Sequence, residues 1–291
     1  MADIQLICNP TAGNGLGEKT GREMAELLKK KNISFELLLT ERPGHATELA
    51  RQAAAQGVKK VASIGGDGTL LEVAEGLCRT KTALGVIPAG TGNDFIKTIG
   101  IPKDPVKALD CFISLPPKKT DTVRINDRMF LNETGTGFDV MVLDYAEKAK
   151  KHVKGLLPYL YGVIRTIFHF RGVHLSLSVD GGPEEEKDIL VLAAGNGRFI
   201  GGGIPIAPDA VPDDGLLDLV VVGRMNRLRM LSVLPGLMKG SILSFKESSF
   251  SRVRKLTLTG RDLRINIDGE ILAMNRAEIE VQPGTLLVCR P

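Results

Sequence analysis

The sequence has few aromatic residues and few cysteines for its length. Its 291 residues include ten phenylalanines, three tyrosines and no tryptophan, which argues against a surface that stacks nucleic-acid bases, so we expect no nucleic-acid partner. The cysteines, at positions 8, 78, 111 and 289, form no CxxC pair, and the four histidines do not cluster with them. This spacing argues against a disulfide framework or a zinc site and favours a reducing compartment.

Long hydrophobic runs are also missing. No stretch approaches the ~20 apolar residues that a transmembrane helix needs, and the first residues, MADIQLICNP, lack the basic segment and apolar core of a signal peptide. We therefore expect a soluble, cytoplasmic protein. The net charge of +4, from 38 basic and 34 acidic residues, is too small to identify an anionic partner.

Glycine is the residue in excess. The chain contains 33 glycines, against a usual share of ~7%, and many are clustered. Clustered glycines indicate loops whose backbone approaches a ligand closely, because a residue without a Cβ leaves the backbone accessible.

The first 115 or so residues alternate between two hydrophobic periods. Short apolar strands are expected at 3–9, 35–39, 58–64 and 84–87, and residues at helical spacing predict helices at 20–31, 46–56 and from 70 to 77. Strand–helix alternation of this kind predicts an α/β domain with a parallel sheet covered on both faces.

The pattern changes near the two prolines at 116 and 117. Beyond them come short β-like runs, interrupted by helical stretches near 138–170 and 225–243, which predict a mostly antiparallel β-sandwich with added helices. The runs lie at 120–125, 129–132, 173–179, 189–194, 217–222, 256–258, 263–267 and 277–281. We expect a nucleotide-binding α/β domain over 1–119 and a β-rich domain over 120–280. The chain end, about 281–291, is a candidate to return to the first domain.

Three glycine loops follow strands of the α/β domain. They lie at 9–17, 65–69 and 88–94, at the carboxyl ends where ligands of such domains bind. Exposed backbone N–H groups and the N-termini of the following helices suit phosphate. The alternative for a single loop is ordinary turn chemistry, but three loops in register favour phosphate. A P-loop NTPase is excluded because Glu18 stands where that motif needs its second glycine.

The second loop places one carboxylate, Asp67, among amides that face phosphate. A carboxylate beside phosphate requires a cation, and Mg²⁺ bridging the two is the usual solution. The alternative is that Asp67 caps the following helix.

With these loops in place, the sequence resembles the soluble lipid kinases of the diacylglycerol kinase catalytic family, which includes sphingosine and ceramide kinases. The resemblance covers nearly the whole chain. Its motifs are Asn-Pro at 9–10 with Gly13, GGDGT at 65–69, PAGTGND at 88–94, FLN at 130–132 with Gly135 and Gly137, IAP at 206–208, DGLLD at 214–218 and DGE at 268–270. One departure is Leu71, where the family often has Asn.

The resemblance implies a fold like that of phosphofructokinases and NAD kinases, and ATP- and Mg²⁺-dependent phosphorylation of a lipid hydroxyl, most simply diacylglycerol to phosphatidic acid. It implies nucleotide contacts from Asn9, Thr40, Gly65, Gly66, Asp67, Gly68, Thr69 and Thr91. It also implies that Asp67 serves the catalytic Mg²⁺ and that Glu270, supported by Asp268, is the general base. A second, structural Mg²⁺ is implied at Asp214 with the carbonyls of Val211 and Leu216, and a homodimer is implied too.

The chemistry of the DGE motif agrees with that role. Phosphoryl transfer needs a group that takes the hydroxyl proton, and an Asp-x-Glu on a strand would put both carboxylates on one face. The alternative is a hairpin turn at Asp268-Gly269. For Asp214 the alternative is likewise a turn.

A lipid substrate implies peripheral membrane association, here at the inner face of the membrane. Residues 156–170 are strongly apolar and follow several lysines, and residues 224–243 combine arginines with apolar residues, a composition that suits an anionic bilayer. The alternative is that both helices only cover the β-rich domain. Two other functions stay open: an NAD kinase, which shares the signature at 65–69, and a non-catalytic nucleotide- or lipid-sensing module.

Overall fold

The N-terminal half is a sheet with helices on both faces. The computed structural model describes residues 4–150 and 157–291. Four strands lie in the order β4-β3-β1-β2, and each neighbouring pair is parallel. Their bounds are β1 Ile4–Cys8, β2 Phe35–Leu39, β3 Lys60–Gly65 and β4 Ala83–Pro88. The helices are α1 Ala12–Lys30, α2 His45–Ala55, α3 Asp67–Leu77, α4 Asp94–Thr98 and α5 Pro105–Ser114.

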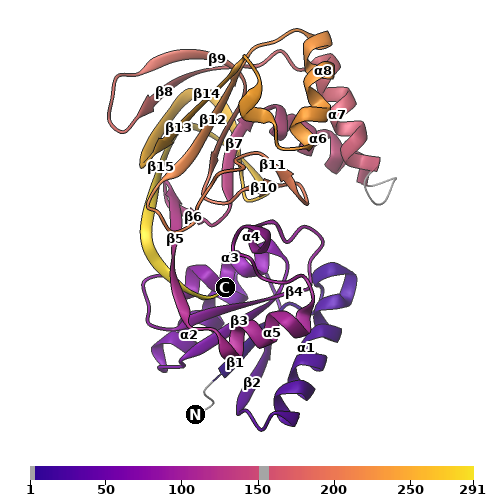
Figure 1. Ribbon diagram of the computed structural model, residues 1–291, viewed down its shortest axis with the longest axis vertical. Helices are drawn as coiled ribbons and strands as arrows, with labels where there is room; N and C mark the ends of the chain where they lie inside the picture. Colours follow the sequence, from indigo (N-terminus) through magenta and orange to yellow (C-terminus); the bar gives the residue numbers. More distant parts are fainter. Residues whose placement is uncertain (1–3, 151–156) are drawn as a thin grey trace.

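Alternate strand residues face two separate cores. On one face, Ile7 and Val61 pack against α2 and α3; on the other, Leu6 and Ile64 pack against α1 and α5. Because both faces are covered, the strands are almost continuously apolar, as a doubly covered parallel sheet requires. The arrangement fixes the carboxyl ends of β1, β3 and β4 at one edge of the domain (Figure 1).

The C-terminal half is rich in β-strands, as predicted. Its main strands are β5 Pro117–Ile125, β6 Arg128–Phe130, β7 Glu133–Gly137, β8 Val173–Val179, β9 Glu185–Gly195, β12 Leu217–Gly223, β13 Ser248–Val253, β14 Lys255–Ile267 and β15 Glu270–Cys289. A small hairpin, β10 Phe199–Ile200 and β11 Ile204–Pro205, stands apart from the main sheet.

These strands differ from a sandwich of two separate sheets, because their hydrogen bonds form one continuous sheet. Val123 on β5 and Leu219 on β12, near opposite ends of that sheet, belong to the same buried cluster. The sheet therefore curls so that its inner face packs against itself.

Outside this sheet lie the helices α6 Phe138–Lys150, α7 Leu157–His169 and α8 Arg227–Met238, and a 3₁₀ turn at Ile242–Ser244. Within the described ranges, no helix has the length and apolar character needed to cross a bilayer.

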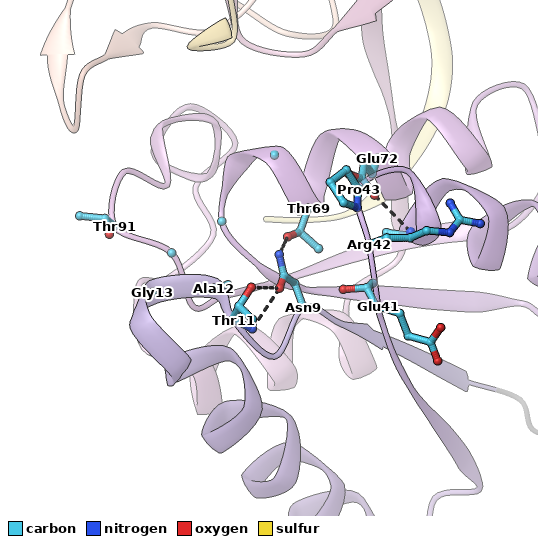
Figure 2. A pocket seen from close by; sticks show the side chains of 15 residues that line it. Asn9, Thr11, Ala12, Gly13, Glu41, Arg42, Pro43, Thr69, Glu72 and Thr91 are labelled. Atoms are coloured by element: carbon cyan, nitrogen blue, oxygen red, sulfur yellow. Dashed lines mark hydrogen bonds between the residues drawn. The ribbon is translucent and has the colours of Figure 1, made fainter. Parts of the chain in front are cut away.

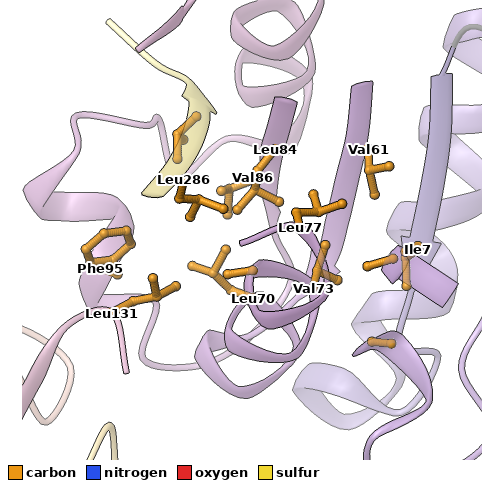
Figure 3. Packing of buried hydrophobic residues seen from close by; sticks show 14 of the residues in the cluster. Ile7, Val61, Leu70, Val73, Leu77, Leu84, Val86, Phe95, Leu131 and Leu286 are labelled. Carbon is orange, nitrogen blue, oxygen red and sulfur yellow. The ribbon is translucent and has the colours of Figure 1, made fainter. Parts of the chain in front are cut away.

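Strand β15 connects the two halves. Its first half pairs with β14 and its second half with β5, and its end pairs with β4 in parallel through Val288 and Leu84. Leu286 and Val288 thereby enter the core of the N-terminal half, where Figure 3 shows Leu286 and Leu131 beside Val86 and Phe95. The end of β15 thus joins the sheet and the core of the first half to the second half.

Candidate active site

A cavity of about 490 Å³ lies at the carboxyl ends of β1 and β3. Figure 2 shows the side chains that line it. All three glycine loops contribute, and so does the segment that follows β2; the lining residues are Asn9, Thr11, Ala12, Gly13, Thr40, Glu41, Arg42, Pro43, Ala46, Gly66, Gly68, Thr69, Glu72, Gly90 and Thr91. The structure therefore brings together six of the eight residues expected to contact nucleotide. Gly65 and Asp67 lie next to this lining and not in it.

Asn9 ties the first glycine loop to the second. Its Oδ1 accepts hydrogen bonds from the backbone N–H of Thr11 at 3.1 Å and from the Thr11 hydroxyl at 2.9 Å. Its Nδ2 donates to Thr69 Oγ1 at 3.2 Å, as the dashed lines in Figure 2 show. Asn9 therefore hydrogen-bonds within its own loop and also to the first turn of α3, which fixes the cavity floor without a ligand.

Glycine is required where the loops touch. A Cβ on Gly90 would lie 2.3 Å from Gly66 Cα, and a Cβ on Gly13 would lie 2.3 Å from the Ala89 carbonyl oxygen. Gly13 also has a φ of +58°, which lies in the left-handed region. The backbones of the three loops are therefore in direct contact, and their N–H groups can converge on phosphate together with the N-terminus of α3.

We predict that Gly90→Ala and Gly68→Ala separate loop packing from ligand approach. Gly90→Ala forces Gly66 away and should cost about 1–3 kcal/mol of unfolding free energy, as overpacking does. A Cβ on Gly68 meets no atom within 4 Å, so Gly68→Ala, in the first turn of α3, should keep or raise the melting temperature. Calorimetry of unfolding and of ATP binding checks both variants. Gly90→Ala should lower both the stability and the affinity for ATP, whereas Gly68→Ala should lower the affinity for ATP alone. Equal melting temperatures of the two variants would contradict the packing argument.

Asp67 does not cap α3, because Gly66 is the N-cap residue and no side-chain cap bond is present there. Instead, Asp67 Oδ1 accepts the backbone N–H of Asp94 at 2.9 Å and so joins the second loop to the third. Burial raises the pKa of Asp67, and the neighbouring Asp94 carboxylate raises it further. The helix-cap alternative is therefore wrong.

A divalent cation fits at Asp67. Asp94, its neighbour, is already neutralised, since Lys97 Nζ lies 2.6 Å from its Oδ1 and the Gly202 N–H donates to its Oδ2 at 2.8 Å. A Cβ on Gly92 would lie 3.0 Å from Asp67 Oδ2, so only glycine leaves that oxygen accessible. A half-buried carboxylate with a raised pKa next to an anion-binding loop is the hard oxygen donor that Mg²⁺ prefers.

Asp268 and Gly269 form the hairpin turn between β14 and β15. Both residues have positive φ values, +46° and +95°, which a two-residue hairpin turn requires. Asp268 accepts the backbone N–H groups of Leu131 at 2.9 Å, Asn132 at 3.1 Å and Glu133 at 2.8 Å. Burial raises the pKa of Asp268 to about 6, and the charge of Asp67 contributes to the rise. Asp67 and Asp268 therefore lie in one electrostatic environment.

Glu270 has a different environment. It is the first residue of β15, its side chain is 61% exposed, and its Oε2 lies 2.7 Å from Arg128 Nη1. The expectation that a strand puts both carboxylates on one face is wrong, because Asp268 belongs to the turn. Asp268 anchors the hairpin to the backbone at 131–133, whereas Glu270 is exposed to solvent and paired with Arg128.

Two further acids lie behind the hairpin. Asn266 donates to Glu133 Oε1 at 2.8 Å and accepts the Gly269 N–H at 2.9 Å, so Glu133 supports the turn through Asn266. Burial raises the pKa of Glu133 well above its ordinary value, and the nearby carboxylate of Asp139 adds to the rise. Burial also raises the pKa of Asp139 to about 6. Burial therefore disfavours the charged forms of both acids.

The expected second Mg²⁺ site is arranged differently. Asp214 Oδ2 contacts the Arg252 guanidinium, and Oδ1 accepts the Leu216 N–H at 3.0 Å. A guanidinium already supplies the positive charge, so this arrangement does not fit a divalent cation held by Val211, Asp214 and Leu216. Asp121 braces the loop instead, since its carboxylate accepts the N–H groups of Gly215 and Gly284, each at 2.7 Å.

Sequence reasoning missed several residues of the site. Arg42 and Glu72 line the cavity, and Glu72 Oε2 accepts the Ala46 N–H at 3.1 Å and so joins α3 to α2. Neither stands in a glycine motif, and no sequence signal marks them. Asp94 could have been found, because it ends the PAGTGND motif and is an acid beside a phosphate-binding loop.

Comparison with known proteins agrees with this geometry. Residues 3–125 match the family model of the diacylglycerol kinase catalytic domain. Residues 132–290 match the YegS C-terminal NAD kinase beta sandwich-like domain. The two matches meet between β5 and β7.

Full-length relatives share the whole chain. A diacylglycerol kinase of Mycobacterium tuberculosis is 30% identical over 297 residues, which cover 100% of this chain and 96% of that protein. A probable lipid kinase YegS-like protein of Pseudomonas aeruginosa is 32% identical over 287 residues, 96% of this chain and 92% of that protein.

Solved structures share the fold. A candidate diacylglycerol kinase from Bacillus anthracis superimposes with a TM-score of 0.80 at 25% identity, covering 99% of this chain and 97% of that chain. An NAD kinase from Archaeoglobus fulgidus in complex with ATP gives a TM-score of 0.54 at 14% identity, covering 99% and 93%, and so shows a common fold alone. The protein is therefore an enzyme of the diacylglycerol kinase family of lipid kinases.

Proposed function

We propose that this lipid kinase transfers the γ-phosphoryl group of ATP to the free hydroxyl of diacylglycerol and forms phosphatidic acid. The observation that carries the proposal is that Asp94, whose N–H group Asp67 accepts beside the glycine-loop cavity, also accepts the N–H group of Gly202 from the other half of the chain. Leu131, whose N–H group Asp268 accepts, packs in the same buried cluster as Phe95 next to Asp94. In this proposal the phosphate-binding loops and the DGE hairpin act as one site. Relatives named diacylglycerol kinase support the acceptor.

Different groups of the chain have separate roles in the proposed reaction. The N–H groups of the glycine loops and of the first turn of α3 hold the phosphates of ATP in the cavity. Asp67 would hold a magnesium ion, which would neutralise charge on the transferred group. Asp268 fixes the hairpin. Glu270 accepts the proton of the lipid hydroxyl as the hydroxyl oxygen bonds to the γ-phosphorus and the bond from that phosphorus to ADP breaks. Arg128 holds Glu270 in place through their ion pair.

An acceptor panel tests the proposal. The purified protein is given labelled ATP and Mg²⁺ with diacylglycerol, monoacylglycerol, sphingosine or a polyprenol in mixed micelles, or with NAD in solution. We expect label in phosphatidic acid, with the highest kcat/KM for diacylglycerol. Preference for another lipid would replace diacylglycerol as the acceptor. Phosphorylation of NAD alone would support an NAD kinase, and ATP binding without turnover on any acceptor would favour a sensing module.

A further inference from the structure

The exposed large apolar side chains are concentrated on two helices of the C-terminal half. Of the twelve found among the described residues, eight lie on α7 and α8. Leu228 is 80% exposed and Leu157 is 61% exposed; the others are Leu160, Tyr161, Ile164, Phe168, Leu231 and Met238. Single exposed apolar residues are normal on a soluble protein, but a group of eight on adjoining helices marks an interaction surface.

The two chain segments that contain these helices are basic. No Asp or Glu occurs between Glu147 and Asp180, or between Asp218 and Glu247, and eleven lysines and arginines occur in those two stretches of the sequence. Acids from other segments pair with two of the arginines, Asp188 with Arg224 and Glu247 with Arg229. An apolar surface whose own segments are basic fits the headgroups and acyl chains of an anionic bilayer.

A basic pocket opens beside these helices. It has a volume of about 480 Å³ and is lined by Arg171, Arg224 and Arg227 together with Phe170, Leu228 and Met230. Arg224 is paired with Asp188 at 3.3 Å. Within the part of the chain that the structure describes, neither Arg171 nor Arg227 has a carboxylate within ion-pair distance. Two guanidiniums without acidic partners, set among apolar side chains, match a phosphate joined to an acyl chain.

The position of this surface suits the proposed reaction. Helix α8 packs against β11, and β10 packs against α4, the helix that begins at Asp94 beside Asp67. Figure 1 shows α7 and α8 on the C-terminal half, away from the helices of the nucleotide domain. A bilayer on this face would therefore touch the half that carries Glu270 and leave the helical layers of the nucleotide domain in water.

We infer that α7, α8 and the pocket at Arg171 and Arg227 dock the protein on an anionic phospholipid bilayer. The inference deepens the proposed function, because a diacylglycerol acceptor stays in the bilayer. Its test measures binding without turnover, so the docking surface and the reaction can fail separately. The partner is a membrane surface, and a second copy of the chain or an acidic protein is an outcome that the test detects.

The test is co-sedimentation of the full chain with phosphatidylglycerol/phosphatidylcholine vesicles and with phosphatidylcholine vesicles. We expect binding to the first, weakened by salt, and little to the second. The double variant Arg171→Gln/Arg227→Gln should bind about thirtyfold more weakly, at about fivefold for each basic group. Leu228→Ser should weaken binding roughly tenfold. All three positions lie on the surface, and unchanged melting temperatures should show that the variants fold.

The matched control is Arg254→Gln/Arg261→Gln, which removes the same charge from exposed positions on the β13–β14 side. Equal binding by the two double variants would overturn the proposal, as would equal binding to both kinds of vesicle. Analytical ultracentrifugation adds a third check. A dimer that Leu228→Ser dissociates, with vesicle binding unchanged, would show that the surface joins two copies and would overturn membrane docking.

Discussion

Replacing Asp67 with asparagine is expected to lower kcat by roughly 10²–10³-fold at saturating ATP and Mg²⁺, the range for losing one preorganised charged group from a reacting site. Asparagine keeps the oxygen that accepts the Asp94 N–H and removes a buried charge whose pKa is already raised. The melting temperature should therefore stay the same or rise. Steady-state kinetics and calorimetry on the same preparation measure both effects.

Asp110→Asn is the matched control for that substitution. Asp110 is an exposed acid on α5 whose ion-pair partner, Lys31, lies 3.3 Å away, far from the glycine loops in the fold. It should leave kcat unchanged. Near-normal turnover of Asp67→Asn would show that Asp67 only joins two loops and does not act at the metal–phosphate junction.

Glu270→Gln is expected to lower kcat by ~10²–10⁴-fold, the usual contribution of a general base, with ATP binding almost unchanged. Glutamine keeps the shape of Glu270 but cannot take the acceptor's proton. A loose transition state, in which the hydroxyl proton leaves late, would put the loss near the lower end. Because Glu270 is 61% exposed, its replacement should not destabilise the fold.

Strand β15 offers a matched control. Glu280 lies on the same strand and also pairs with an arginine, Arg124, at 3.0 Å, so Glu280→Gln removes a comparable ion pair outside the site. Asp268→Asn should instead lower the melting temperature, since Asp268 accepts three backbone N–H groups with two oxygens. If Glu270→Gln retains about half of the wild-type kcat or more, well outside the general-base range, Glu270 is not the base.

Strands and helices that bury one apolar face could be predicted from the sequence. The expected strand at 173–179 is β8 to the residue, because its apolar residues alternate cleanly. The glycine loops were also predictable, since clustered glycines after a strand are typical of a loop whose backbone approaches a ligand. The local hydrophobic pattern was sufficient where the period of the apolar residues matches the burial of those residues in the structure.

Other strands carried no such signal. Strand β7, Glu133–Gly137, contains no apolar residue although all five residues are buried, because it lies between β9 and β14. The separate strands expected at 256–258 and 263–267 are one strand, β14, with an irregularity between Thr259 and Leu263. Position in the sheet, and not residue type, decides these cases.

The sequence predicted which residues belong to the site, but not which groups each of them contacts. Asp67 was expected to meet a cation or cap a helix, but its contact with Asp94 depends on how two loops meet in space. Likewise, Arg252 on Asp214 and Arg128 on Glu270 come from distant strands. A sequence motif specifies which groups are present, and tertiary packing decides which charge each one faces.

The return of β15 to the first half has a consequence for synthesis of the protein. Leu286 and Val288 lie on β15, which follows every strand of the C-terminal half in the sequence, yet they fill the core built around β3, β4 and α3. A nascent chain that has emerged only as far as β5 still lacks that part of its interior and the neighbour of β4. Folding of the nucleotide half is therefore completed only after the C-terminal half has been synthesised, and a fragment cut after residue 119 should leave an apolar gap where these side chains belong.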